Sequence, residues 1–169
     1  MHTLYVLRHA KSSWSDPALP DEDRPLAPRG RRAAKSVAKH LVREGIAPEL
    51  VLCSPARRTR ETLELLRPAL ATATVVAVED ELYGASAGAL VTRLRAIPEA
   101  VASVLLIGHN PALQDLILAL ALPGSERDRL AEKFPTAALA TLTFGAATWE
   151  QLADRGGLLA AYVVPRELT

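Results

Sequence analysis

The sequence contains a single cysteine, Cys53, among its 169 residues. One cysteine excludes a disulfide within the chain, and the lack of cysteine clusters excludes a zinc site built on thiolates. No run approaches the roughly 18 apolar residues of a membrane span, and no basic segment followed by an apolar stretch begins the chain. We therefore expect Cys53 to be a small core residue and the protein to be cytoplasmic.

Excess charge of either sign is also missing, because 20 basic and 19 acidic residues give a formal net charge of +1. This balance argues against binding to nucleic acid or to a membrane through bulk charge, so any positive field must be local. The zinc pattern His-Glu-x-x-His is absent, as are the glycine patterns of phosphate loops and dinucleotide-binding turns. We expect no metal and no cofactor.

What the sequence does contain favours one compact domain over residues 1–169, since 49% of the residues are hydrophobic. Short apolar runs alternate with segments of helical period, which predicts an α/β fold with a mainly parallel sheet. Ser54 and Pro55 are expected to be the N-cap and first residue of the second helix. Strands are predicted over 3–7, 50–53, 74–78, 104–107, 139–144 and 158–164, and helices over 28–44, 55–67, 87–97 and from 110 onward.

Basic residues and histidines follow the predicted strands. Arg8 and His9 come directly after the first strand, and His109 follows the fourth. Arg58 lies in the first turn of the helix after the second strand. Parallel α/β sheets bind ligands outside the carboxyl ends of their strands, and helix N-termini attract anions. Guanidinium groups match phosphate oxygens well, so the sequence predicts a site for a phosphoryl group.

Three segments carry a resemblance to a known family: Leu-Arg-His-Ala-Lys-Ser over 7–12, Ser-Pro-x-x-Arg over 54–58 with Glu-Thr at 61–62, and Gly-His-Asn-Pro over 108–111. Together they resemble the histidine phosphatase superfamily. The segments 23–26, 81–83 and 132–138 are most similar to its compact phosphohistidine phosphatases of the SixA type. The resemblance implies a phosphoglycerate mutase-like fold, a three-layer sandwich in which helices flank the sheet on both sides.

By this resemblance, His9 attacks phosphorus and carries a transient phosphohistidine that water hydrolyses. Attack requires one free nitrogen of His9, with the other held by a partner such as a backbone carbonyl. Arg8, Arg58 and His109 would surround the phosphoryl oxygens. Further candidates for phosphate or substrate binding are Asn110, Ser12 and Arg24, and Lys133 and Thr136 are candidates for a loop beside the site. Arg24 either steers phosphate or stabilises the loop before the first helix.

The general acid is ambiguous in the sequence. Glu81 is our preferred candidate, while Asp80 and the cluster Asp21-Glu22-Asp23 compete with it. Imidazole is a better leaving group than an alkoxide, so a phosphohistidine substrate demands less of an acid than a phosphate ester does. A missing or poorly placed acid would therefore favour phosphoramidate chemistry.

These residues leave three functions open. The first is a metal-independent phosphatase that acts on protein phosphohistidine. The second is a small-molecule phosphomonoesterase with Glu81 as general acid, and the third is a module that binds a phosphorylated partner without turnover. The expected partner is a phosphorylated protein or a small phosphate-containing compound, and neither nucleic acid nor a membrane.

Overall fold

A computed structural model describes residues 1–168 and contains one six-stranded mixed sheet. Its strands are β1 (His2–Arg8), β2 (Leu50–Cys53), β3 (Val75–Val78), β4 (Ser103–Gly108), β5 (Leu139–Phe144) and β6 (Leu158–Val163). The order is β3-β2-β4-β1-β5-β6. The first four of these strands are mutually parallel, and β5 and β6 are antiparallel to their neighbours. The predicted α/β class with a mainly parallel sheet is confirmed.

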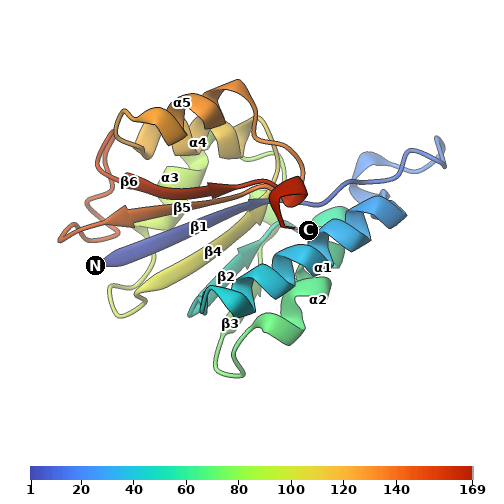
Figure 1. Ribbon diagram of the computed structural model, residues 1–169, viewed down its shortest axis with the longest axis horizontal. Coiled ribbons are helices and arrows are strands. Elements are labelled where there is room, and N and C mark those ends of the chain that lie inside the picture. Colours follow the sequence, from blue (N-terminus) through green and yellow to red (C-terminus); the bar gives the residue numbers. More distant parts are fainter. Residues whose placement is uncertain (169) are drawn as a thin grey trace.

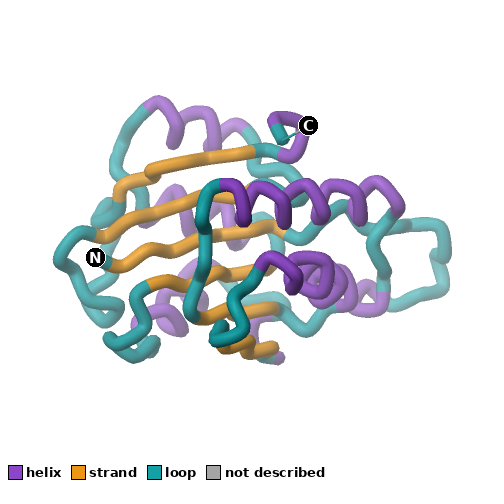
Figure 2. Tube along the Cα trace, turned by 60° about the horizontal axis from the view of Figure 1, so that its bottom comes forward, coloured by secondary structure: helices purple, strands orange, loops and turns teal. Residues whose placement is uncertain are grey.

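Helices cover both faces of this sheet, which makes three layers (Figure 1). One face carries α1 (Pro28–Arg43) and α2 (Arg57–Leu66), which lie across the near side of the strands in Figure 2. The other face carries α3 (Ala87–Arg95), α4 (Ala112–Leu120) and α5 (Ser125–Glu132). Short 3-10 turns complete the chain: η1 (Asp21–Asp23), η2 (Arg67–Ala69), η3 (Asp80–Leu82) and η4 (Pro165–Glu167).

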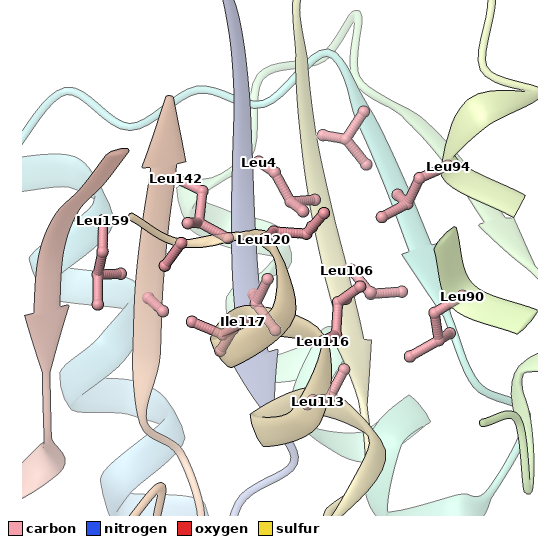
Figure 3. Packing of buried hydrophobic residues seen from close by; sticks show 14 of the residues in the cluster. Leu4, Leu90, Leu94, Leu106, Leu113, Leu116, Ile117, Leu120, Leu142 and Leu159 are labelled. Carbon is pink, nitrogen blue, oxygen red and sulfur yellow. The ribbon is translucent and has the colours of Figure 1, made fainter. Parts of the chain in front are cut away.

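The sheet separates two clusters of buried hydrophobic residues. In the larger one, α4 packs on β1 and β4, with Leu116 and Ile117 over Leu4 and Leu106 (Figure 3). These α4 residues belong to the apolar face that helical periodicity indicates. Val37 of α1 lies in the smaller cluster. Each cluster holds its helices against one face, which fixes where the loops at the strand ends emerge.

The second and fifth helices differ from the expectations. Ser54 is not the N-cap of α2, because the helix begins at Arg57 with Ala56 as its cap. The Ser54 hydroxyl instead bonds to His109. The helix α5 was not predicted, since only Leu130 among its residues is buried and one apolar residue gives no periodicity. No helix within residues 1–168 has the length and apolarity that a bilayer crossing requires.

Close packing fixes the start of α1 beside the loop that follows β1. A Cβ atom on Gly30 would lie 2.1 Å from the carbonyl oxygen of Lys11. The same carbonyl accepts a 2.9 Å hydrogen bond from the amide of Ala27. Only glycine allows this approach, so α1 and the loop carrying His9 form one rigid contact. Beyond it, the chain between Ser13 and Pro20 projects past the edge of the sheet (Figure 1).

Candidate active site

The structure brings Arg8, His9, Arg58 and His109 together at the carboxyl ends of β1, β2 and β4. The ring centroids of His9 and His109 are 5.4 Å apart. Arg58 Nη2 lies 3.4 Å from His109 Nδ1. The side chains of His9 and Arg58 are buried, each residue being 6% exposed. Two histidines and two guanidinium groups therefore share one small, poorly solvated region.

His9 is held in a defined orientation. Its Nδ1 lies 2.7 Å from the carbonyl oxygen of Ala10, a distance at which the ring N–H donates to that oxygen. The backbone carbonyl expected as a partner is thus present, and the lone pair remains on Nε2. Burial lowers the pKa of His9 to about 3, and the nearby charges of His109, Arg58 and Arg8 lower it as well, against the opposing hydrogen bond to Ala10. At neutral pH the His9 imidazole is therefore uncharged.

His109 is oriented by Ser54, whose hydroxyl oxygen lies 2.7 Å from His109 Nε2. The Arg58 guanidinium can only donate, so its 3.4 Å contact makes His109 Nδ1 the acceptor, and the ring proton on Nε2 is donated to the Ser54 hydroxyl oxygen. Tyr83 meets the His109 ring edge to face, with centroids 5.6 Å apart. Burial lowers the pKa of His109 to about 4, and the charge of Arg58 contributes in the same direction. His109 is therefore neutral at neutral pH, with one ring nitrogen bonded to Ser54 and the other to Arg58.

The two arginines of the cluster are positioned by carbonyl oxygens. Arg8 Nη1 donates to the carbonyl of Phe134 at 3.1 Å, and Arg58 Nη1 donates to that of Asp21 at 2.7 Å. Burial lowers the pKa of Arg8, and the neighbouring charge of Arg58 lowers it further. The buried Nε atoms of Arg8 and Arg58 have no hydrogen-bond partner among the described residues. Adjacent cations with unsatisfied donors favour the binding of an anion.

Asp21 completes the cluster, although the sequence marked it only as a competing acid. Its Oδ2 accepts hydrogen bonds from Arg58 Nη2 at 2.9 Å and from the Tyr83 hydroxyl at 2.6 Å. The hydrogen bond from Tyr83, followed by the interactions with Arg58 and Arg24, lowers the pKa of Asp21 to about 2. The carboxylate is therefore ionised at neutral pH and holds Arg58 in place rather than serving as a proton donor.

Arg24 contacts both Asp21 and Ser12. Arg24 is 7% exposed, and it donates to Ser12 Oγ at 2.9 Å and to Asp21 Oδ1 at 3.2 Å. Its guanidinium carbon also lies 3.5 Å from the ring centroid of Trp14. Of the two roles left open for Arg24, these contacts support stabilisation of the loop before α1.

Asn110 bridges two segments beside the cluster. Its Oδ1 accepts from the amide of Gln114 at 3.2 Å, which satisfies a donor in the first turn of α4. Its Nδ2 donates to the Phe134 carbonyl at 3.1 Å, the oxygen that Arg8 also binds. Asn110 thus fixes the 133–136 segment, which contains Lys133 and Thr136, next to Arg8.

The two carboxylates proposed as general acids lie apart from these hydrogen bonds. Glu81 and Asp80 are exposed on η3. Within residues 1–168, no hydrogen bond or ion pair of their side chains connects them to the cluster. The preceding residue, Glu79, is bound by Arg93 at 2.7 and 2.9 Å. Tyr83, rather than Glu81, extends from this turn to His109 and Asp21.

Thr62 links the loop that carries His9 to α2, a role for which the sequence gave no signal beyond its place after Glu61. Its hydroxyl accepts a hydrogen bond from the amide of Ala10 at 3.0 Å and donates to the carbonyl of Arg58 at 2.7 Å. Thr62 is 1% exposed. Ala10, whose carbonyl orients His9, and Arg58 are therefore connected through one buried hydroxyl.

Both histidines of the cluster should make the protein less stable in acid. Their folded-state pKa values of about 3 and 4 lie below the ordinary 6.5, so between about pH 4 and 6.5 the unfolded chain binds more protons. The free energy of unfolding should then rise with pH by up to about 1.4 kcal/mol per unit for each histidine. Urea unfolding at several pH values should show a shallower slope in His9→Asn/His109→Asn than in the wild type. Equal slopes would contradict the prediction.

Proteins of known sequence and structure are similar to this chain over most of its length. The model of the histidine phosphatase superfamily (branch 1) matches residues 4–103. A protein of Mycobacterium tuberculosis named only as uncharacterised is 35% identical over 167 residues, covering 95% of this chain and 100% of its own. Within residues 1–168, no group of three or more His, Cys, Asp or Glu side chains is arranged to hold a metal ion.

Solved structures give the same result over the whole chain. A candidate phosphohistidine phosphatase SixA from Nakamurella multipartitia has a TM-score of 0.83 and 31% identity, covering 97% of this chain and 96% of its own. The protein histidine phosphatase SixA complexed with tungstate has a TM-score of 0.79 and 29% identity, covering 99% of both chains. Since the family model spans more than half of the sequence and these structures share its fold, the chain belongs to the histidine phosphatase superfamily.

Proposed function

We propose that this chain is a phosphatase that removes the phosphoryl group from phosphohistidine side chains of proteins. The observation that carries the proposal is the state of His9, which is neutral and bonded through Nδ1 to Ala10, so that Nε2 is available beside Arg8 and Arg58. An uncharged imidazole with an oriented lone pair is the group that covalent phosphoryl transfer requires. Recognition of phosphate without turnover would need only the cations.

The reaction has two steps. His9 Nε2 forms a bond to phosphorus while the P–N bond of the substrate breaks, and the departing imidazole takes up a proton from solvent. Water then attacks phosphorus, the bond to His9 breaks, the water returns a proton to solvent, and inorganic phosphate leaves. Arg8, Arg58 and His109 surround the phosphoryl oxygens, and the two guanidinium groups stabilise their charge in both steps.

The arrangement of acids favours phosphohistidine over an alkyl phosphate. Asp21 is held ionised by Tyr83 and Arg58, and Glu81 is exposed outside the hydrogen-bonded cluster. An alkoxide leaving group requires protonation during bond cleavage, whereas imidazole requires much less help. The name of the similar tungstate-bound structure, a protein histidine phosphatase, supports the same substrate class.

The test compares turnover of a phosphohistidine-containing protein with turnover of alkyl and aryl phosphate esters, in EDTA and with His9→Ala as the blank. We expect rapid loss of phosphohistidine, slow cleavage of alkyl esters and no effect of EDTA. Glu81→Gln should change turnover of phosphohistidine by less than about twofold, because an exposed carboxylate outside the cluster contributes little.

Two results would contradict the proposal, and each would support one of the two other functions. Efficient alkyl ester cleavage that Glu81→Gln reduces more than about tenfold would assign a phosphomonoesterase with Glu81 as its acid. Binding of the phosphorylated protein without turnover of any substrate would assign a binding module.

A further inference from the structure

A groove of about 790 Å³ lies beside the active site, between α1, the segment 129–136 and the end of β6 with η4. Two of its lining residues connect it to His9. Lys11 is two residues after His9, and Thr136 precedes Ala137, whose amide contacts the carbonyls of Arg8 and His9 at 3.1 and 3.0 Å. The groove therefore borders the loop that carries the nucleophile.

The rim of this groove is strongly basic in a chain whose net charge is only +1. Glu132 is the one acidic residue that lines it. Six basic residues line the groove, and one of them, Arg129, forms ion pairs with Glu126 and Glu167. The other five basic lining residues are exposed, and no ion pair joins them to a carboxylate within residues 1–168; they are Lys11, Arg29, Arg32, Lys133 and Arg166. This part of the surface is therefore a concentrated and uncompensated positive field.

The floor of the groove is apolar. It is lined by Ala33, Pro135, Tyr162, Val164 and Pro165. The ring of Tyr162 is held in place by the guanidinium carbon of Arg129, 4.3 Å from its centroid. An apolar floor with cations along the rim matches a ligand that carries both apolar and acidic side chains.

The placement of the cations favours an extended ligand over a compact one. Lys11 comes from the β1–α1 loop, Lys133 from the segment before β5, and Arg166 from η4. The arginines at 29 and 32 stand one turn apart on α1. A single phosphate group meets converging donors in one place, whereas an extended acidic segment meets cations spread along its length.

We propose that this groove binds an acidic, partly apolar segment of the phosphoprotein next to its phosphohistidine. The segment would lie along the basic rim while the phosphorylated side chain enters the site at His9. The inference rests on the proposed function and adds the class of protein that the enzyme selects. It makes the groove a source of substrate specificity that is separate from the phosphate-binding residues.

The test uses Arg32→Glu/Arg166→Glu, with Lys35→Glu/Lys39→Glu as the matched control. Lys35 and Lys39 are exposed on α1, do not line the groove, and give the same change in net charge. A fluorescein-labelled peptide in which glutamates alternate with apolar residues should bind the groove variant at least roughly tenfold more weakly than the control, and wild-type affinity should fall with added salt. A peptide with glutamine in place of glutamate should bind weakly to all three proteins.

A catalytic measurement separates docking from chemistry. With a phosphohistidine peptide that has acidic flanks, the groove variant should show a raised KM and an unchanged kcat relative to the control. Free phosphohistidine, which is too short to occupy the groove, should be turned over equally by both variants. Together these results would support the groove as the docking site.

Other outcomes overturn one proposal or the other. Equal peptide binding by both double variants, or equal binding of the glutamate and glutamine peptides, overturns the proposal that the groove binds an acidic segment. Binding of inorganic tripolyphosphate but not of the acidic peptide would show that the groove binds a compact anion, and would also overturn the proposal that it binds an acidic segment. If the acidic peptide binds as expected while no phosphohistidine substrate is turned over, the proposed function fails and the groove's preference for acidic segments stands.

Discussion

Replacing His9 by alanine should lower turnover of phosphohistidine by at least about a thousandfold. The variant removes the nitrogen to which we assign the covalent intermediate, and His109 is a poor substitute, since its Nε2 is occupied by Ser54 and its Nδ1 by Arg58. Steady-state release of inorganic phosphate measures the loss. His40→Ala is the matched control, because His40 lies in the last turn of α1, outside the cluster.

The intermediate gives a second readout for the same prediction. Wild-type protein mixed with substrate and stopped in alkali should carry a phosphoryl group that survives base and is released by acid, as a P–N bond on imidazole is. His9→Ala should carry none. A labelled His9→Ala protein, or a variant with wild-type turnover, would assign the nucleophile to another residue.

Replacing Arg58 by alanine should lower kcat/KM by more than tenfold. A charge-assisted hydrogen bond contributes about 1.5–3 kcal/mol, and the variant also removes Arg58 from Asp21, so that only Tyr83 and Arg24 still bind this carboxylate beside the bound phosphate. Arg58→Lys should recover part of the loss, because lysine keeps the charge but not the planar pair of donors. Arg60→Ala is the control, since Arg60 is exposed on the same helix and contacts the carbonyl of Pro55.

The pairing of Arg58 with Asp21 allows two causes of the lost activity to be separated, the missing guanidinium group and repulsion by the Asp21 carboxylate. If part of the loss in Arg58→Ala is repulsion between phosphate and a carboxylate that has lost one of its two arginine partners, then Asp21→Asn in the same chain should restore some activity. Asp21→Asn alone should lower activity, because it releases Arg58. Activity of Arg58→Ala within about threefold of the wild type would show that Arg8 and His109 are sufficient to bind the phosphoryl group.

Much of the fold follows from local sequence patterns. The strands β2 and β5 have the predicted bounds, because short apolar runs between polar segments mark them clearly. The four residues of the cluster were also predictable, since each follows a strand or begins a helix at the same edge of a parallel sheet. These signals depend only on neighbours along the chain.

The supporting residues were harder to predict, because their contacts join distant segments. Asp21 reaches Arg58 across 37 residues and Tyr83 across 62. Ser54 was expected to cap a helix, a role that depends on local sequence, and instead contacts His109, 55 residues away. No spacing rule marks such pairs. The three-dimensional structure was therefore needed to show that Asp21 belongs to the cluster and that Glu81 lies outside its hydrogen bonds.

The antiparallel direction of β5 places the groove and the cluster of Arg8, His9, Arg58 and His109 side by side on different elements of the fold. A parallel strand beside β1 would begin at the opposite edge of the sheet, but β5 begins at the edge where β1 ends, and so brings the segment 133–138 next to His9. The phosphate cluster uses α2 and the parallel half of the sheet, whereas the groove is built on α1 and on the chain from α5 to η4. The contacts that join the two parts on the groove side come from the backbone, the Phe134 carbonyl to Arg8 and the Ala137 amide to the Arg8 and His9 carbonyls, so exchanging side chains along the groove would leave them in place.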